Sequence, residues 1–311
     1  EIDSVVQDGR RLDFRRDGNA FFDTTATPQI LGGVYAVSVY YHGRPQIAKR
    51  PPWEGGFSWT TDSLGRPWIV TTDQGMGASV WWPNKDTQAE EPDSQRIAIT
   101  VPKPLMNISN GRLRSTTDNP DNTTTYEWFS NNPINNYAIA VAAGVYDHWR
   151  YTYAGESGPL TMDFYPMKYN LERAKRVFPQ SISMMKCFEH WFGPYPFYED
   201  GYKLIEVPNT GMEHQSAVTY GNRFANGYLE RDWTGVGRSL AIEILEFLDT
   251  LGITQRVGDA RKMRKDFVPI LGAATALPSS AQIDPEELAS ITYTSGTTDR
   301  PKGVMLSQYA Y

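Results

Sequence analysis

Short runs of β-branched and aromatic residues, separated by turn residues, fill the first part of the chain. Residues 30–41 (ILGGVYAVSVYY) form the first run, and residues 96–101, 123–129 and 137–146 repeat the pattern at short spacing. Such runs are typical of β-strands. The segments between them contain Asn-Gly, Asp-Asn-Pro and Asn-Asn-Pro, whose residues tolerate a positive φ or fix φ for a turn. Residues 1 to about 165 are therefore predicted to form mostly antiparallel sheet.

The hydrophobic period changes to that of a helix near residue 170. Residues 170–178 (NLERAKRVF) begin with an N-cap type residue and place apolar side chains three positions apart. Pro179 interrupts this pattern, and residues 180–193 predict a second helix that ends at a glycine. Residues 203–207 and 217–220 have the composition of short strands. This alternation of helix and strand indicates a mixed α/β domain.

The chain is predicted to contain three parts. Residues 1–165 form a β-rich N-terminal domain, residues 166–237 begin a mixed α/β domain, and residues 238–311 form a composite C-terminal segment. In the last part, residues 238–251 predict an amphipathic helix, and aromatic density falls because all nine tryptophans lie at or before Trp233. We expect this segment to be the least ordered part, because a lone hairpin exposes its edges and buries little core.

Composition narrows the classes of partner. The net charge of −6 and a pI near 5.3 argue against a nucleic-acid-binding protein, which needs a surplus of Lys and Arg on one face. No apolar stretch approaches the roughly 18 to 20 residues of a membrane span. Cys187, the single cysteine, cannot form an internal disulfide and is predicted to be a small buried apolar residue. The negative net charge remains compatible with a positively charged partner, or with a substrate whose terminal group is positively charged.

Two segments carry a resemblance to a known family. Residues 52–94 (PWEGGFSWTTDSLGRPWIVTTDQGMGASVWWPNKDTQAEEPDS) and residues 208–222 (PNTGMEHQSAVTYGN) resemble the gluzincin zinc aminopeptidases of the aminopeptidase N class. The resemblance extends over about residues 20–237. It implies a β-rich N-terminal domain ahead of a thermolysin-like catalytic domain, a zinc cofactor, and removal of residues from peptide N-termini.

The resemblance also implies substrate-binding residues. The exopeptidase loop of the family carries a glycine ahead of Met-Glu-Asn, which Gly211, Met212 and Glu213 match, with His214 in place of the asparagine. In the family, the glutamate pairs with the free α-ammonium group of the peptide, because a buried charge needs an opposite partner. Gln74 matches a glutamine that assists through its amide oxygen. Without the resemblance, Glu213 and Gln74 would be interpreted as ordinary surface residues.

The zinc-binding motif of the family is absent from this sequence. His-Glu-x-x-His places two histidines one helical turn apart on Zn²⁺, with a glutamate that activates the bound water. The chain has four histidines, no two of them four residues apart: His42, His148, His190 and His214. We therefore assign no catalytic or metal-ligating residue and expect binding without hydrolysis. A replacement site made of Glu189, His190 and His214 is a weaker alternative, because His190 lies among aromatic residues and is predicted to be buried or half-buried.

The last part of the chain resembles a different superfamily. Residues 284–307 (DPEELASITYTSGTTDRPKGVMLS) resemble the phosphate-loop motif of adenylate-forming enzymes, which include acyl-CoA synthetases. Hydroxyl groups, loop amides and one ammonium group cradle phosphates in such loops. The nucleotide-binding residues that the resemblance implies are Thr294, Ser295, Gly296, Thr297, Thr298 and Lys302. Asp299 stands where the family usually has glycine and places a negative charge beside the phosphates, so we expect common descent without nucleotide binding.

Three functional interpretations follow. The first is a zinc metallo-aminopeptidase relative that binds peptide N-termini. The second is a catalytically silent binding or scaffold chain, and the third is a fragment of an ATP-dependent adenylate-forming enzyme. The simplest account of the whole sequence is a composite of the first and third families.

Overall fold

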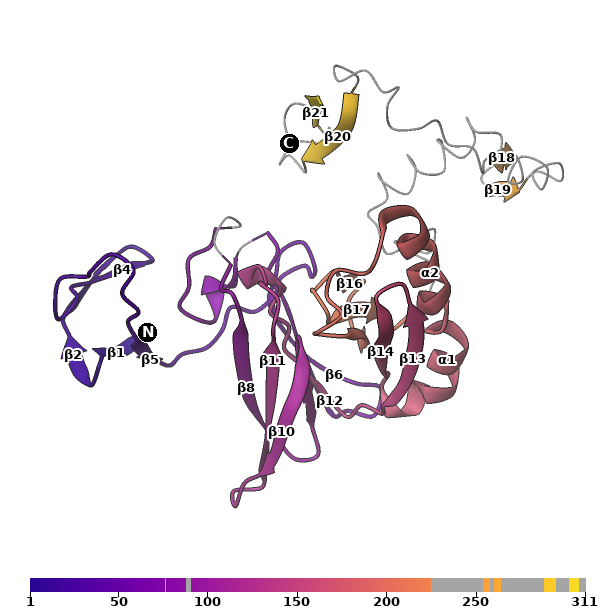
Figure 1. The fold of residues 1–311 in the computed structure, drawn as a ribbon. Coiled ribbons are helices and arrows are strands. Elements are labelled where there is room, and N and C mark those ends of the chain that lie inside the picture. The colour runs from indigo at the N-terminus through magenta and orange to yellow at the C-terminus, as the bar shows by residue number, and fades with distance from the viewer. Residues whose placement is uncertain are drawn as a thin grey trace. The chain divides into compact units, whose positions relative to one another are not determined.

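The computed structural model describes residues 1–75, 77–87 and 91–224, together with the backbone of four strands between residues 254 and 307 (Figure 1). The chain divides into two compact units, Glu1–Val236 and Gly237–Tyr311. The first unit consists of antiparallel sheets followed by a mixed sheet with two helices. The predicted fold class, a β-rich part followed by a partial mixed α/β part, is confirmed.

The chain begins with two small antiparallel sheets. One has the strand order β2-β1-β5 and the other is the hairpin β3-β4. The strands are β1 (Ile2–Gln7), β2 (Arg10–Leu12), β3 (Phe14–Asp17), β4 (Ala20–Asp23) and β5 (Val37–Tyr41). The strand predicted at residues 30–41 is therefore only partly right. Gly32, at φ 78°, lies in a turn that the hydrogen bond from Gly33 N to Ile30 O closes, so the chain becomes extended only at Val37.

Two larger antiparallel sheets pack around the main core. Their orders are β10-β11-β8 and β6-β7-β12-β9. The strands are β6 (Gly56–Thr61), β7 (Pro67–Thr72), β8 (Gln95–Pro102), β9 (Met106–Ile108), β10 (Arg112–Asp118), β11 (Thr123–Ser130) and β12 (Ala142–Gly144). Buried Trp68, Ile108 and Trp128 lie in one apolar cluster, so the sheets share a core. The strands predicted at 96–101 and 123–129 are confirmed.

The strand predicted at residues 137–146 is mostly wrong. Only Ala142–Gly144 is strand, and Asn136–Ala138 forms the short 3₁₀ helix η2, whose N-cap is Asn135. The residues between them are buried without pairing in a sheet. Their apolar side chains lie in the core, and side-chain oxygens accept two of their backbone N–H groups: Ala140 N donates to Asn110 Oδ1 at 2.7 Å, and Val141 N donates to Thr71 Oγ1 at 2.9 Å.

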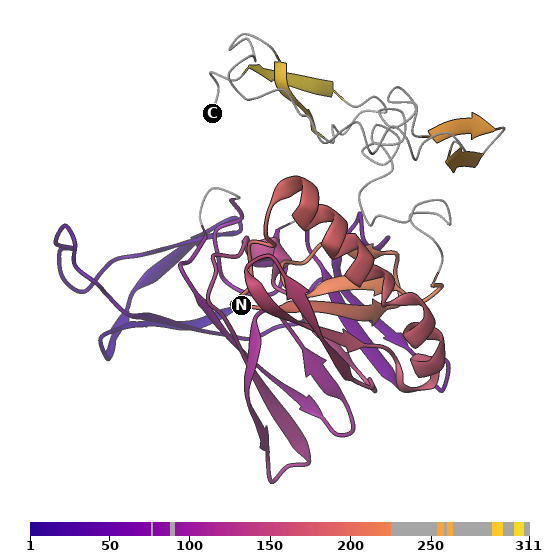
Figure 2. The same ribbon diagram turned by 45° about the vertical axis from the view of Figure 1, so that its right-hand side comes forward.

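A mixed five-stranded sheet follows, with the order β13-β14-β15-β17-β16. Strands β14, β15 and β17 run parallel, and the outer two pairs are antiparallel. The elements are β13 (Trp149–Gly155), β14 (Gly158–Tyr165), η3 (Lys168–Asn170), α1 (Leu171–Val177), α2 (Gln180–Phe192), β15 (Tyr202–Val207), β16 (Gly211–Met212) and β17 (Val218–Gly221). Both helices lie against this sheet, where Ala174, Phe178 and Met185 join its buried cluster (Figures 1 and 2).

The predicted helices at 170–178 and 180–193 are confirmed, and so are the strands at 203–207 and 217–220. Pro179 separates the helices as the N-cap of α2, and Gly193 ends α2 at φ 86°. Two predictions on α2 are wrong. Cys187 and His190 are exposed, because the buried face of the helix carries Ser181, Met185 and Glu189 instead.

Two antiparallel strand pairs are described in the second unit. They are β18 (Thr254–Val257) with β19 (Ala260–Met263), and β20 (Leu288–Thr294) with β21 (Lys302–Ser307). The helix predicted at 238–251 lies outside the described residues. The boundaries 1–165, 166–237 and 238–311 stay predictions. Within the part of the chain that is described, no helix has the length and apolar character needed to cross a membrane.

A buried polar contact joins the sheet β10-β11-β8 to the mixed sheet. The carboxylate of Asp200, just before β15, accepts hydrogen bonds from Asn131 N at 2.7 Å, Asn132 N at 3.1 Å and Ser130 Oγ at 2.7 Å. In return, the guanidinium group of Arg112 on β10 donates to backbone carbonyls of the segment before β15. We call these two reciprocal contacts the Asp200–Arg112 junction.

The first prediction concerns this junction. Asp200→Ala leaves the buried hydroxyl of Ser130 and the partly buried N–H groups of Asn131 and Asn132 without their acceptor, so it should lower the free energy of unfolding by about 3 kcal/mol at pH 7. Burial acts to raise the pKa of Asp200, but the hydrogen bonds from Asn131, Asn132 and Ser130 lower it overall. The ionised Asp200 carboxylate therefore stabilises the fold fully above the unfolded pKa of about 4. This stabilisation is lost as the pH falls through the lower pKa of the folded state.

Urea unfolding followed by tryptophan fluorescence measures this difference. Asp93→Ala, at an exposed aspartate, is the control and should change stability by less than about 0.5 kcal/mol. Equal unfolding midpoints for wild type and Asp200→Ala at pH 7 would contradict the importance of the junction.

Candidate functional site

The turn after β7 presents an exposed glutamine above a buried aspartate. The backbone oxygen of Asp73 accepts from Gly77 N at 2.8 Å, which closes the turn before the 3₁₀ helix η1 (Ala78–Val80). The Asp73 side chain is fully buried, and its Oδ2 accepts from Trp81 Nε1 at 2.8 Å. Gln74, the next residue, is exposed. The buried pair therefore fixes the turn from which Gln74 projects.

The environment of Asp73 disfavours its charged form. Burial raises the pKa of this carboxyl to about 7, the hydrogen bond from Trp81 opposes the shift, and the negative charge of Asp86 adds to it. Its Oδ1 has no hydrogen-bond partner. Asp73 is thus a carboxyl that changes protonation near neutral pH directly beneath an exposed turn.

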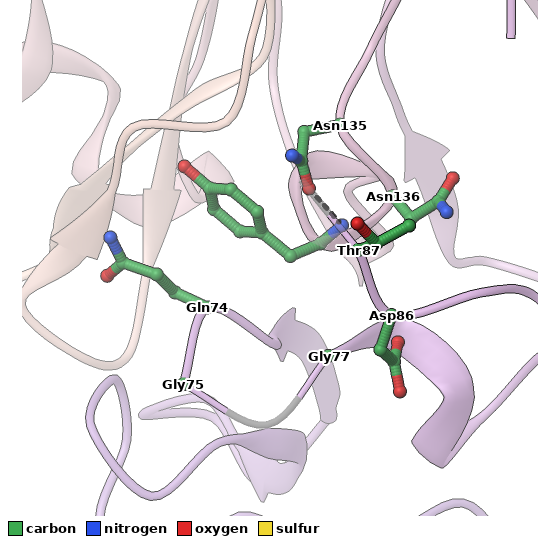
Figure 3. A pocket seen from close by; sticks show the side chains of 8 residues that line it. Gln74, Gly75, Gly77, Asp86, Thr87, Asn135 and Asn136 are labelled. Atoms are coloured by element: carbon green, nitrogen blue, oxygen red, sulfur yellow. Dashed lines mark hydrogen bonds between the residues drawn. The ribbon is translucent and has the colours of Figure 1, made fainter. Parts of the chain in front are cut away.

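A pocket of about 230 Å³ opens beside this turn (Figure 3). The backbone of Gly75 and Gly77 contributes to its lining, and residue 76 lies outside the described residues. Gln74 and Asp86 lie on opposite sides of that backbone in Figure 3. The remaining side chains of the lining are Thr87 and, from the start of η2, Asn135, Asn136 and Tyr137. Most of this lining is polar.

Tyr137 connects the pocket to the loop that carries Glu213. Its hydroxyl donates to Glu213 Oε1 at 3.2 Å, across 76 positions of sequence. Burial, followed by the charge and the hydrogen bond of Glu213, raises the pKa of Tyr137 to about 12, so the hydroxyl stays protonated and remains a donor at pH 7. Glu213 itself is exposed. Tyr137 therefore links Glu213 to a pocket that Gln74 also lines.

The predicted residues Gly211 and Met212 form β16 and support Glu213. Both pair with β17, Gly211 with Tyr220 and Met212 with Thr219. Gly211 has φ 100°, and a Cβ at this position would lie 2.4 Å from Thr219 O, so only glycine fits. Met212 is buried. These two residues form the short strand that ends just before Glu213, and the pocket lining does not include them.

The loop after Glu213 is held by residues from the β-rich part. Asn110 Nδ2 donates to Gln215 O at 2.6 Å, and Gly111 N donates to Ser216 Oγ at 2.9 Å. His214 is fully buried, neither of its ring nitrogens has a hydrogen-bond partner, and burial lowers its pKa to about 4. The imidazole is therefore neutral at pH 7.

The described residues do not fit a zinc ion. Among residues 1–75, 77–87 and 91–224, no group of three His, Cys, Asp or Glu side chains could hold a metal. The replacement site considered above fails for a specific reason. Glu189 is buried and accepts hydrogen bonds from Tyr198 OH at 2.5 Å and Tyr195 N at 3.1 Å, whereas His190 is exposed and His214 is enclosed.

The predicted nucleotide-binding residues are described only in part. Thr294 ends β20 and Lys302 begins β21, and the two residues are directly paired. The residues that join them, including Ser295, Gly296, Thr297 and Thr298, lie outside the described residues. Their role in nucleotide binding stays a prediction.

Sequence reasoning missed five side chains that line the pocket. The sequence predicts a strand at Tyr137, and it singles out none of Asp86, Thr87, Asn135 and Asn136. Asp86 lies within the segment that carries the aminopeptidase resemblance, which is the one signal that pointed toward it. The contact between Tyr137 and Glu213 has no signature in local sequence.

Solved structures with a similar fold are M1 zinc metallopeptidases. The enzyme from Deinococcus radiodurans aligns with a TM-score of 0.61 at 16% sequence identity, over 71% of this chain and 49% of that one. Two mutant forms give the same score and identity, over 71% of this chain and 50% of theirs: a two-domain M1 zinc metallopeptidase bound to L-arginine, and the Deinococcus radiodurans enzyme bound to a Tyr-Ser-Ala substrate. This chain spans about half the length of these structures, and at this identity the likeness shows a shared fold.

The second resemblance is confirmed by a family model. Residues 234–311 match the model described as AMP-binding enzyme. No curated protein sequence matches the chain significantly. The chain thus shares the fold of M1 zinc metallopeptidases and carries an AMP-binding match in its last part.

The second prediction concerns Asp73. Asp73→Asn replaces a carboxyl of pKa about 7 by a neutral amide that can still accept from Trp81. Because the folded-state pKa is raised above the unfolded value of about 4, wild type loses stability as the pH rises between these values, whereas the variant keeps it. The stability of the variant relative to wild type should therefore increase over this range by a few kcal/mol, on the order expected for such a shift, and then level off.

Urea unfolding at pH 5, 6, 7 and 8 gives this difference directly. Asp23→Asn, at an exposed aspartate, should show a flat difference over the same range. If the stability difference between Asp73→Asn and wild type also stayed constant with pH, the pKa of Asp73 would not be raised in the folded state.

Proposed function

We propose that residues 1–224 bind the N-terminal end of a peptide through its free α-ammonium group. The observation that carries this proposal is the contact between Tyr137 and Glu213 at the edge of a pocket that Gln74 also lines. Glu213 is exposed and therefore accessible to a ligand. The shared fold with peptidases, one of them bound to a peptide substrate, supports the choice of ligand.

Each of the three side chains has a distinct role in this proposal. Glu213 supplies the negative charge that pairs with the ammonium group, which is the strong form of hydrogen bond. Tyr137 occupies Oε1 of that carboxylate and so leaves Oε2 directed to the ligand. Gln74 offers an amide oxygen as a further acceptor. An acetylated N-terminus has no charge and fewer donors, so the site discriminates against it.

We further propose that this chain binds peptides without hydrolysing them. When bound, zinc supplies a Lewis acid and an activated water in metallopeptidases. The sequence contains no His-Glu-x-x-His motif, and the described residues offer no substitute ligand set. The site residues that are present bind and orient the amino end, and none of them is placed to activate water. Zinc aminopeptidase activity would need ligands from beyond these residues.

The third prediction tests the ammonium site. Wild type should bind Leu-Ala-Ala measurably and its N-acetylated form at least tenfold more weakly, because the loss of one charged hydrogen bond costs about 1.5–3 kcal/mol. Glu213→Gln should abolish most of this difference. Glu172→Gln, at an exposed glutamate on α1, is the matched control and should preserve it. Calorimetric titration measures the affinity of wild type and of each variant for the free and the acetylated peptide.

Two results would overturn the proposal. Equal affinity for free and acetylated peptide would show that no ammonium site exists. Release of the first residue by wild type in the presence of zinc, inhibited by a chelator, would contradict binding without hydrolysis.

The second candidate function is adenylate formation by the last part of the chain. The AMP-binding match over residues 234–311 favours it, and β20 and β21 flank the predicted phosphate loop. The acidic Asp299 within that loop opposes phosphate binding electrostatically.

The fourth prediction separates this candidate from the first. Titration of the full chain with ATP and Mg²⁺ should show no saturable binding, because Asp299 repels the phosphates. Saturable binding that Lys302→Ala removes would instead establish the adenylate-forming function.

A further inference from the structure

A buried lysine contacts the segment that supports the Glu213 loop. Lys203 on β15 is 2% exposed, and its Nζ donates to the carbonyl oxygen of Gly111. The ammonium group also lies over the Trp128 ring, 5.4 Å from the ring centre. Lysine is almost never fully buried unless an opposite charge pairs with it. The burial of Lys203 therefore needs a specific explanation.

Neither of the two aspartates that face Lys203 pairs with it. Within the described part of the chain Lys203 forms no ion pair, and both carboxylates already have other partners. Asp163, directly opposite on β14, accepts from Arg150 Nε at 2.8 Å and lies 2.6 Å from His148 Nε2. Asp200 accepts the hydrogen bonds of the Asp200–Arg112 junction. The one hydrogen-bond acceptor of the buried ammonium group among these residues is thus a backbone carbonyl.

The surroundings of Lys203 disfavour its charged form. Burial is the largest cause and lowers the pKa of Lys203 to about 7. The charges that act on it belong to the elements packed around it: Asp163 on β14 and Asp200 ahead of β15, which raise the pKa, and Arg112 on β10 and Arg150 on β13, which lower it. A buried charge of this kind costs folding free energy. Lys203 therefore changes between a charged and a neutral donor near neutral pH.

The acceptor of Lys203 leads directly to the Glu213 loop. Gly111, whose carbonyl accepts from Lys203, donates from its own N–H to Ser216 Oγ at 2.9 Å. Ser216 is buried and has φ 57°, a backbone conformation that side chains rarely adopt and that surrounding contacts must hold. The two hydrogen bonds of Gly111 thus connect the ammonium group to a strained residue three positions after Glu213.

We propose that Lys203 is a positioning residue for the loop that carries Glu213, and that the charge on its ammonium group sets how strongly Gly111 and Ser216 hold this loop. The inference rests on the proposed binding of peptide N-termini. A charged donor makes a hydrogen bond roughly twice as strong as a neutral one and is attracted to the face of an aromatic ring. The loop is therefore ordered for peptide binding when Lys203 is charged and is held less strongly when it is neutral.

The fifth prediction compares wild type with Lys203→Met, which keeps a long unbranched side chain and removes the charge. At pH 6, wild type should bind Leu-Ala-Ala about tenfold more tightly than the variant, on the order of one charged hydrogen bond. At pH 8.5 the two affinities should agree within about twofold, because Lys203 is then mostly neutral. Both proteins share the titration of the peptide and of Asp73, so the ratio of their affinities cancels it. Calorimetric titration gives this ratio.

Stability should change with pH in the opposite direction. The folded-state pKa of Lys203 lies below the unfolded value of about 10.4, so the unfolded chain binds more protons between these values. Wild type should therefore gain stability relative to Lys203→Met as the pH rises from 6 to 8.5. A side chain with a purely structural role would improve peptide binding as it stabilises the fold. Urea unfolding at both pH values thus separates positioning from stability.

A second variant tests the path from Lys203 to the loop. Ser216→Ala removes the acceptor of Gly111 N and should weaken peptide binding at pH 6 by itself. The double variant with Lys203→Met should lose less affinity than the product of the two single losses, because both changes break the same chain of contacts. Lys186→Met, at an exposed lysine on α2, is the control and should match wild type at both pH values.

The outcomes separate this inference from the proposed function. If the ratio of wild type to Lys203→Met is the same at both pH values, or if the two single losses simply multiply, Lys203 does not position the loop, while the ammonium site stands. If wild type binds no free-amine peptide at pH 6, the proposed function fails and the inference fails with it.

Discussion

Five hydrogen bonds from Ser130, Asn131 and Asn132 converge on the carboxylate of Asp200, and the arrangement of the sheets depends on them. A buried carboxylate is stable only when donors replace the water it has lost. Here the donors come from the end of β11 and the acceptor from the approach to β15. Arg112 makes the reciprocal contact: its guanidinium group, on β10, donates to the backbone carbonyls of Tyr198 and Glu199 ahead of β15. A charged side chain from each side thus bonds to the backbone of the other.

The same junction encloses a buried lysine. Lys203 on β15 donates from Nζ to the carbonyl of Gly111, and its ammonium group lies 5.4 Å from the centre of the Trp128 ring. Burial lowers the pKa of Lys203 to about 7, while the charges of Asp163 and Asp200 act to raise it. Gly111 and its neighbour Asn110 also hold the loop after Glu213. The position of Glu213 is therefore set by contacts that begin at the junction between the sheets.

Alternating and helical periods predicted the regular elements well. Strands β8 and β11 and both helices lie close to where the sequence placed them, because their side-chain period matches burial on one face. Strand β15, which also lies where it was predicted, is buried at every position. The prediction failed at residues 137–141, where an apolar run fills the core and the N–H groups of Ala140 and Val141 donate to side chains. Val141 N, for example, donates to Thr71 Oγ1 at 2.9 Å, across 70 positions. The secondary-structure preference of a short segment contains no information about such distant partners.

The residues of the candidate site also differ in whether the sequence alone could identify them. Glu213 and Gln74 were predicted through a family resemblance, whereas Tyr137 becomes part of the site only when the mixed sheet docks on the β-rich part. The loop that follows Glu213 takes its support from outside its own sheet, through Asn110 and Gly111. Among the described residues, the contact between Tyr137 and Glu213 thus depends on the junction between two sheets. The amine-binding site that we propose needs no residue of the zinc-binding motif.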